Sequence, residues 1–140
     1  MNKIKYVASL IVLLVVFTAC SKLSNLTGGD KLYFCEKYTN DGEVGISDRF
    51  TTGYLTVMVK CDYALKLDDV SIQYDKYDDR TGKFEFYKKF SFDVDRDMSY
   101  IFFEQNDESD LIFDDEGFYR VFLLDEDDKT IASALIEIID

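Results

Sequence analysis

The chain has 140 residues, of which 47% are hydrophobic, and its 28 acidic and 16 basic side chains give a formal net charge of -12. This length and apolar content suit one domain with a packed core, and the negative charge argues against binding to nucleic acid. The sequence contains no His and no Trp, so it lacks the commonest general base and zinc ligand as well as the residue of a tryptophan-based sugar platform.

The chain begins with a segment that is typical of a secretory signal. Lys3 and Lys5 form a short basic region, and the apolar run Val7–Phe17 is too short to span a membrane comfortably. The run closes with Thr18, Ala19 and Cys20.

These features resemble the signal peptide and lipobox of a bacterial lipoprotein. The resemblance implies cleavage before Cys20, a diacylglyceryl thioether on its sulfur, and membrane attachment through acyl chains. Because each buried methylene contributes about 0.8 kcal/mol, two or three such chains hold a protein durably without a transmembrane helix. The alternative interpretation is an ordinary secretory signal with an incidental cysteine.

The resemblance also divides the chain and suggests where the protein resides. Residues 1–19 are the signal peptide, residues 20–30 a lipidated, flexible tether, and residues 31–140 the folded domain. In enterobacterial lipoproteins a residue other than Asp after the cysteine implies the outer membrane, and here that residue is Ser21. The expected location is therefore the bacterial cell envelope, with the periplasmic and external faces both left open.

The remainder of the chain favours short strands. No stretch has a convincing period of 3.6 residues, whereas several alternate with period two and are separated by Asn, Asp and Gly clusters. The predicted strands are Lys31–Tyr38, Thr52–Cys61, Val70–Lys76, Lys83–Phe92, Ser99–Glu104, Phe118–Leu124 and Thr130–Ile139. The predicted fold class is all-β, as a single antiparallel β-sandwich of about seven strands.

Alternation within these strands predicts the side chains of the core. The inward positions are Leu55, Val57, Val59 and Cys61; Val70, Ile72 and Tyr74; Phe84, Phe86, Phe90 and Phe92; Tyr119, Val121 and Leu123; and Ala132, Ala134, Ile136 and Ile138. Tyr87, Phe118 and Phe122 fall on the opposite faces. They are candidates for stacking on sugars, with ordinary sheet packing as the favoured alternative.

The pattern Asp115-x-Gly117-x-Tyr119-x-Val121 resembles the start of strand F in immunoglobulin-like (Ig-like) domains. The resemblance implies that the Tyr119 hydroxyl bonds to backbone just upstream and that Gly117 allows a sharp turn into the strand. Val121 stands where antibody domains have a cysteine, which excludes their intersheet disulfide. The pattern therefore resembles the wider class of bacterial Ig-like and fibronectin-III-like modules, which do not need this disulfide.

If Cys20 is lipidated, Cys35 and Cys61 remain as an even pair. Outside the cytoplasm such a pair predicts a disulfide, and the separation of 26 residues corresponds to about 3–4 kcal/mol of stabilisation. The alternative is two buried thiols that act as small hydrophobic side chains. No catalytic role is expected for either, because no His is present to activate a thiolate.

Asp93, Asp95 and Asp97, with Glu104 at the twelfth position, carry the oxygen ligands of a Ca²⁺ loop. Met98 occupies the sixth position, where such a loop needs Gly, and the flanks predict strands. The favoured interpretation is a solvated, charged edge that discourages edge pairing, with a Ca²⁺ site as the alternative.

The sequence contains no phosphate-binding Gly loop, nucleophile elbow or metal-ligand motif, so neither enzymatic activity nor a cofactor is expected. The leading hypothesis is a non-catalytic module that binds another envelope or extracellular protein or takes part in an assembly. The alternatives are a Ca²⁺- or glycan-binding surface module, and an accessory or inhibitor subunit of an envelope enzyme or secretion machine.

Overall fold

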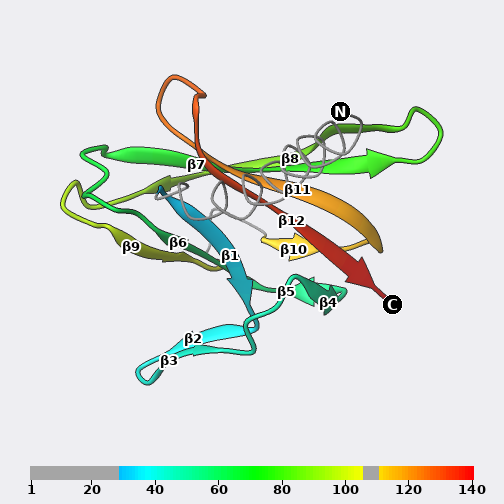
Figure 1. Cartoon of the computed structure of the whole chain (residues 1–140), viewed down its shortest axis with the longest axis horizontal. Coiled ribbons are helices and arrows are strands. Elements are labelled where there is room, and N and C mark those ends of the chain that lie inside the picture. Colours follow the sequence, from blue (N-terminus) through cyan, green and yellow to red (C-terminus); the bar gives the residue numbers. More distant parts are fainter. Residues whose placement is uncertain (1–28, 106–110) are drawn as a thin grey trace, which may run out of the picture.

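The structure is a computed structural model, and it describes residues 29–105 and 111–140. The predicted signal peptide and Cys20 lie outside this part. The described part contains twelve strands and no helix, so the all-β fold class is confirmed (Figure 1). Within the same ranges, no helix has the length and apolar character needed to cross a membrane.

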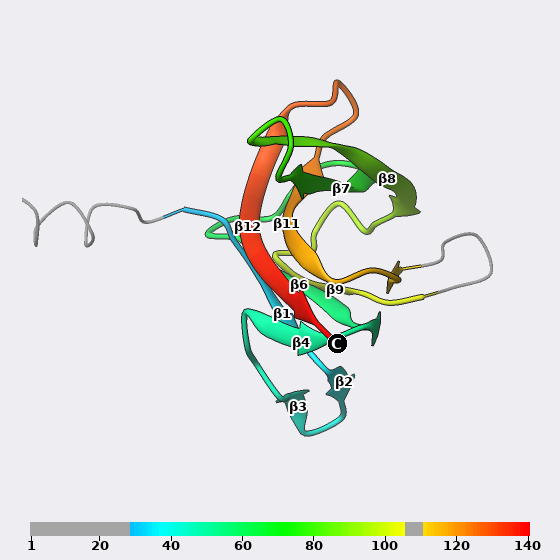
Figure 2. The same cartoon turned by 90° about the vertical axis from the view of Figure 1, so that its right-hand side faces the viewer.

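Two larger sheets organise the chain (Figures 1 and 2). The five-stranded sheet has the order β4 (Arg49–Thr51), β12 (Thr130–Ile139), β11 (Gly117–Leu124), β7 (Asp69–Asp78) and β8 (Lys83–Asp93). The three-stranded sheet has the order β1 (Lys31–Cys35), β6 (Thr56–Lys60) and β9 (Tyr100–Phe103). Two short pairs complete the fold, namely β2 (Lys37–Thr39) with β3 (Gly42–Val44), and β5 (Gly53–Tyr54) with β10 (Ile112–Phe113).

The strand pattern differs from the prediction in two respects. Two predicted strands break in two: Lys31–Tyr38 at Glu36 into β1 and β2, and Thr52–Cys61 at Leu55 into β5 and β6. The two- and three-residue strands carry too little alternation to be recognised from sequence. In addition, β4 pairs with β12 in parallel, with Phe50 opposite Ile138. The larger sheet is therefore mixed, not antiparallel throughout.

The two larger sheets share one hydrophobic core. Val57 on β6, Ile72 on β7 and Val121 on β11 are fully buried in it. The inward positions predicted by alternation on β6, β7, β11 and β12 are confirmed as buried or packed against this core. Burial of these side chains, at roughly 1.5–3 kcal/mol each, is the main favourable contribution to folding.

The predicted core face of β8 is wrong over half its length, because the strand contains a β-bulge. Tyr74 on β7 pairs with Lys88, but the next residue, Asp75, pairs with Phe86, so Tyr87 is an extra residue without a partner across the ladder. A bulge of this kind reverses the alternation on one side of it.

The reversal divides the four phenylalanines of β8 between the two faces of the sheet. Phe90 and Phe92 pack against the core, as predicted. Phe86 is instead 65% exposed on the outer face, and Phe84 packs edge-on against Tyr77 at 5.3 Å. Tyr87, predicted to face outward, packs against the core. The outer face of the five-stranded sheet is consequently more aromatic than the sequence pattern indicates.

Candidate functional site

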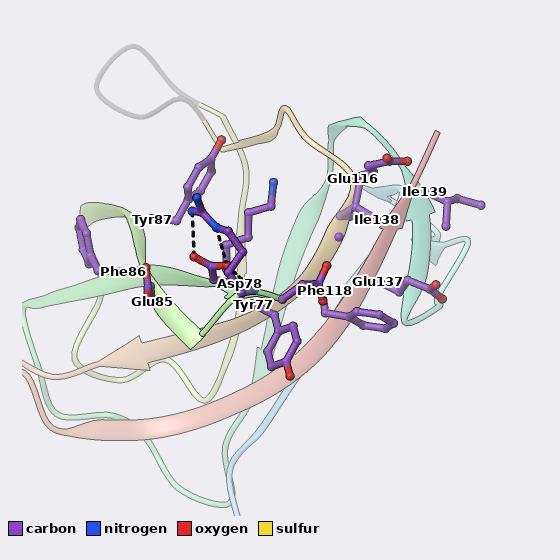
Figure 3. A pocket seen from close by; sticks show the side chains of 14 residues that line it. Tyr77, Asp78, Glu85, Phe86, Tyr87, Glu116, Phe118, Glu137, Ile138 and Ile139 are labelled. Carbon is purple, nitrogen blue, oxygen red and sulfur yellow. Dashed lines mark hydrogen bonds and ion pairs between the residues drawn. The ribbon is translucent and has the colours of Figure 1, made fainter. Parts of the chain in front are cut away.

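A groove opens at one end of the five-stranded sheet, where the β7–β8 hairpin separates from β11. Pairing between β7 and β11 ends at Lys76 and Tyr119, whereas β7 and β8 remain paired as far as Asp78 and Lys83. The space between the hairpin and the start of β11 has a volume of about 730 Å³ (Figure 3). The end of β12 lines its far side.

Three exposed aromatic rings line this groove. Phe86 is 65% exposed, Phe118 is 53% exposed, and Tyr77 is 37% exposed. Figure 3 shows the rings of Tyr77 and Tyr87 on opposite sides of the hairpin ribbon, in agreement with the bulge at Tyr87. Exposed rings that gather at a concave site, unlike single exposed apolar residues, are typical of a binding surface.

Carboxylates surround the aromatic rings. The acidic residues of the groove are Asp78, Asp79, Glu85, Glu116 and Glu137. Arg80 pairs with Asp78 at 3.1 Å, and Arg49 pairs with Glu137 at 3.0 Å. The hydrogen bonds from Arg80 hold the pKa of the Asp78 carboxyl below its usual value. The groove thus combines apolar rings with an excess of negative charge.

The wall of the groove on the β11 side is held by Tyr119 and the residues just before it. Tyr119 is fully buried, and its hydroxyl donates a 2.7 Å hydrogen bond to the backbone oxygen of Asp115. Burial raises the pKa of this hydroxyl well above its usual value, which keeps it protonated and able to donate. Gly117 has φ +137, a conformation that L side chains rarely adopt.

The Asp115 side chain links this turn to the hairpin. Its carboxylate lies 3.3 Å from the Lys76 ammonium and accepts a 3.3 Å hydrogen bond from the Tyr87 hydroxyl. The Lys76 ammonium also lies 5.5 Å from the centre of the Tyr119 ring, within range of a cation–π contact. These contacts set the position of the hairpin relative to β11, and hence the width of the groove.

The residues predicted to stack on sugars do not form one surface. Phe118 and Phe122 alternate with the buried Tyr119, Val121 and Leu123, so both lie on the outer face of the sheet. Tyr87 is separated from them by the bulge and packs edge-on against Tyr119 at 5.7 Å.

Cys35 and Cys61 are both buried and are free thiols, so the predicted disulfide is not formed. Cys35 pairs with Thr56 at one end of the β1–β6 ladder, and Cys61 follows Lys60 at the other end. Five residues of strand separate Thr56 from Cys61, or about 17 Å, whereas a disulfide joins Cα atoms less than about 7 Å apart. Burial raises the pKa of Cys61 to about 11, which leaves its thiol unreactive at neutral pH.

Three of the four carboxylates of the predicted Ca²⁺ loop, those of Asp93, Asp97 and Glu104, each have a different neighbour. Asp97 pairs with Lys66 at 2.7 Å, and Glu104 accepts a hydrogen bond from the Thr56 hydroxyl at 3.1 Å. Asp93 lies opposite Asp69 in the β7–β8 ladder, and its proximity raises the pKa of Asp69. Among residues 29–105 and 111–140, no group of three potential ligands is placed to hold a metal ion.

A second aromatic cluster, not predicted from the sequence, lies on the outer face of the three-stranded sheet. The Tyr38 ring stacks on Phe102 with centroids 4.5 Å apart. The Glu43 carboxylate accepts hydrogen bonds from the hydroxyls of Tyr33 and Tyr100, which lower its pKa. These contacts attach the β2–β3 hairpin to this sheet, so the cluster has a structural role. Its sequence signal was the presence of aromatic residues on both faces of β9, where Tyr100 and Phe102 alternate with Ile101 and Phe103.

Comparisons of the chain with protein-family models, with curated proteins and with solved structures find no match.

Proposed function

We propose that this protein is a non-catalytic lipoprotein of the bacterial cell envelope, anchored through Cys20, which binds another protein through the groove between the β7–β8 hairpin and β11. The observation that carries the proposal is the exposure of Phe86, Phe118 and Tyr77 together in one concave site. Large exposed rings are the side chains that contribute most to protein interfaces when a partner buries them. The sequence resemblance of residues 1–20 to a lipoprotein signal supports the anchor.

We also propose that residues 31–140 form a variant of the Ig-like β-sandwich. Its support is the core shared by the two larger sheets and the hydrogen bond from Tyr119 to the backbone of Asp115. The seven predicted strands would correspond to β1, β6, β7, β8, β9, β11 and β12, with the remaining short strands as additions.

Site-specific photo-crosslinking in intact cells tests the binding function. A photoreactive amino acid at Phe118 or Phe86 is expected to crosslink to one defined protein, and the same amino acid at Tyr63 is not. Tyr63 is a suitable control because it is 85% exposed, precedes the start of β7 in the chain and does not line the groove. The absence of crosslinks from both groove positions, or equal crosslinking from Tyr63, would contradict the proposal.

The anchor is tested separately by metabolic labelling with a radioactive fatty acid. The wild-type protein is expected to incorporate label and to sediment with membranes, and the Cys20→Ser variant to lose both properties. Label that persists in the Cys20→Ser variant would place any acyl chain elsewhere.

A glycan ligand is the second candidate, because Phe118 and Phe122 share the outer face of the sheet. A sugar that stacks on these rings should lose affinity with both Phe118→Ala and Phe122→Ala. A protein bound in the groove should lose affinity with Phe118→Ala but not with Phe122→Ala. This difference separates the two candidates, since Phe122 does not line the groove.

A further inference from the structure

The three carboxylates Asp79, Glu85 and Glu116 are exposed and line the groove without an ion-pair partner among the residues that the structure describes. Glu85 accepts one hydrogen bond, from the Thr81 hydroxyl at 3.2 Å.

The two basic residues that line the groove are already engaged with other acids. Arg80 is paired with Asp78, and Lys76 lies 3.3 Å from Asp115. The lining therefore has more negative than positive charge, in a chain whose net charge is already -12. An anionic occupant would be repelled, and a cationic occupant would be attracted both at long range and within the groove.

The aromatic rings of the groove favour a cation for an independent reason. The face of a phenyl ring carries partial negative charge, so Lys and Arg side chains bind over it, and more strongly where water is excluded. Phe86 and Phe118 both line the groove with exposed side chains, one from β8 and one from β11. Apolar rings also accommodate the methylene stem of a Lys or Arg side chain.

We infer that the groove binds an extended segment of a partner protein that is rich in Lys or Arg. Basic side chains of the segment lie against the rings of Phe86 and Phe118, and Asp79, Glu85 and Glu116 neutralise their charge. This inference rests on the proposed function, because it specifies the chemistry of the partner at the same site. A neutral apolar segment and a second copy of the chain are the other occupants that the experiment must distinguish.

The test uses the full-length protein, purified from membranes in nonionic detergent, and three fluorescent peptides of equal length. The peptides alternate Val with Lys, with Gln or with Glu, and binding is followed by fluorescence anisotropy at low and at physiological ionic strength. The Lys peptide is expected to bind, with an affinity that falls as salt rises, and the Glu peptide is not. Equal binding of the Lys and Gln peptides, or no binding of the Lys peptide at millimolar concentration, would overturn the inference.

Two charge variants make the test specific for the groove. One combines Asp79→Asn, Glu85→Gln and Glu116→Gln, and the control combines Glu36→Gln, Asp41→Asn and Asp62→Asn, which are exposed residues outside the groove. Both variants remove the same three charges, and matching melting temperatures verify that both are folded. Affinity for the Lys peptide is expected to fall about tenfold in the groove variant and by much less in the control. Equal losses of affinity in the two variants would show that the Lys peptide is attracted by the net charge of the protein, and would overturn the inference.

Crosslinking of the groove variant in cells separates this inference from the proposed function. Reduced crosslinking from position 118 in the groove variant, but not in the control variant, supports both proposals. Undiminished crosslinking shows that the groove binds a protein without using its acidic residues, which overturns the inference alone. A concentration-dependent crosslink to a second copy of this chain would likewise overturn the cationic partner and retain the groove as an interface.

Discussion

The hydroxyl of Tyr119 lies 2.7 Å from the backbone oxygen of Asp115, four residues earlier in the chain. This hydrogen bond fixes the turn that brings β11 into the sheet, and the same turn places Glu116 and Phe118 on the wall of the groove. The stability of the domain and the shape of its candidate binding site therefore depend on one buried side chain.

Loss of this hydroxyl is expected to destabilise the domain. Tyr119→Phe should lower the free energy of unfolding by about 1 kcal/mol or more, because the hydrogen bond from the buried Tyr119 side chain to the Asp115 backbone is lost. Denaturant unfolding measures the change. Tyr87→Phe is the matched control, since its hydroxyl bonds at 3.3 Å to a carboxylate whose side chain is 60% exposed and can be solvated instead. Equal stability of Tyr119→Phe and the wild type would contradict this role.

The bulge at Tyr87 predicts opposite behaviour for two phenylalanines of the same strand. Phe90→Ala should lower the free energy of unfolding by about 2 kcal/mol or more, because Phe90 packs against the core and its ring centroid lies 6.2 Å from that of Tyr74. Phe86→Ala should change stability by less than about 0.5 kcal/mol, because the side chain is 65% exposed. The two variants are compared by thermal and denaturant unfolding. A large cost for Phe86→Ala would indicate an uninterrupted strand, with both side chains in the core.

The separation of Cys35 and Cys61 predicts two protected thiols. In the folded protein neither should react with iodoacetamide at neutral pH, because both are buried and the pKa of each is raised by desolvation. After unfolding without reductant, both should be alkylated in full, and mass spectrometry of peptides detects the modification. If alkylation required a reductant, a disulfide would be present and the β1–β6 register would be wrong.

The opposed carboxylates of Asp69 and Asp93 predict a pH-dependent effect on stability. The hydrogen bond to Asp93 and burial raise the folded-state pKa of Asp69 above its ordinary value of 3.8. A raised carboxyl pKa means that folding disfavours the charged form, so stability falls as pH rises through this pKa. Asp93→Asn should consequently raise the melting temperature at pH 7 and leave it nearly unchanged near pH 3, where Asp69 is protonated with or without Asp93.

Melting curves of the Asp93→Asn variant at both pH values provide the test, with Asp95→Asn as the control. The Asp95→Asn substitution also removes one negative charge from this segment. Asp95, however, does not lie opposite another carboxylate in the β7–β8 ladder. A rise in melting temperature at pH 7 in both variants would show that the stabilisation comes from the change in net charge. A loss of stability in Asp93→Asn at pH 7 would contradict the repulsion between the two carboxylates.

Local patterns in the sequence determined the all-β class, the positions of the longer strands and most of the inward faces. Alternation predicts these features because burial acts on each side chain according to its own position in the strand. Val57, Ile72 and Val121 are buried as predicted. Of the two aromatic groove residues that alternation predicted to face outward, Phe118 does so, whereas Tyr87 packs against the core.

The tertiary structure alone decided the register between strands and everything that depends on it. The extra residue at Tyr87 cannot be recognised from β8, because a bulge exists only relative to the partner strand. Cys35 ends β1 and Cys61 directly follows β6, and the antiparallel register of these adjacent strands puts the two cysteines at opposite ends. The groove likewise requires β7 to leave β11 after Lys76 while it stays paired with β8. Each of these features depends on which residues pair across strands, and local alternation carries no information about that pairing.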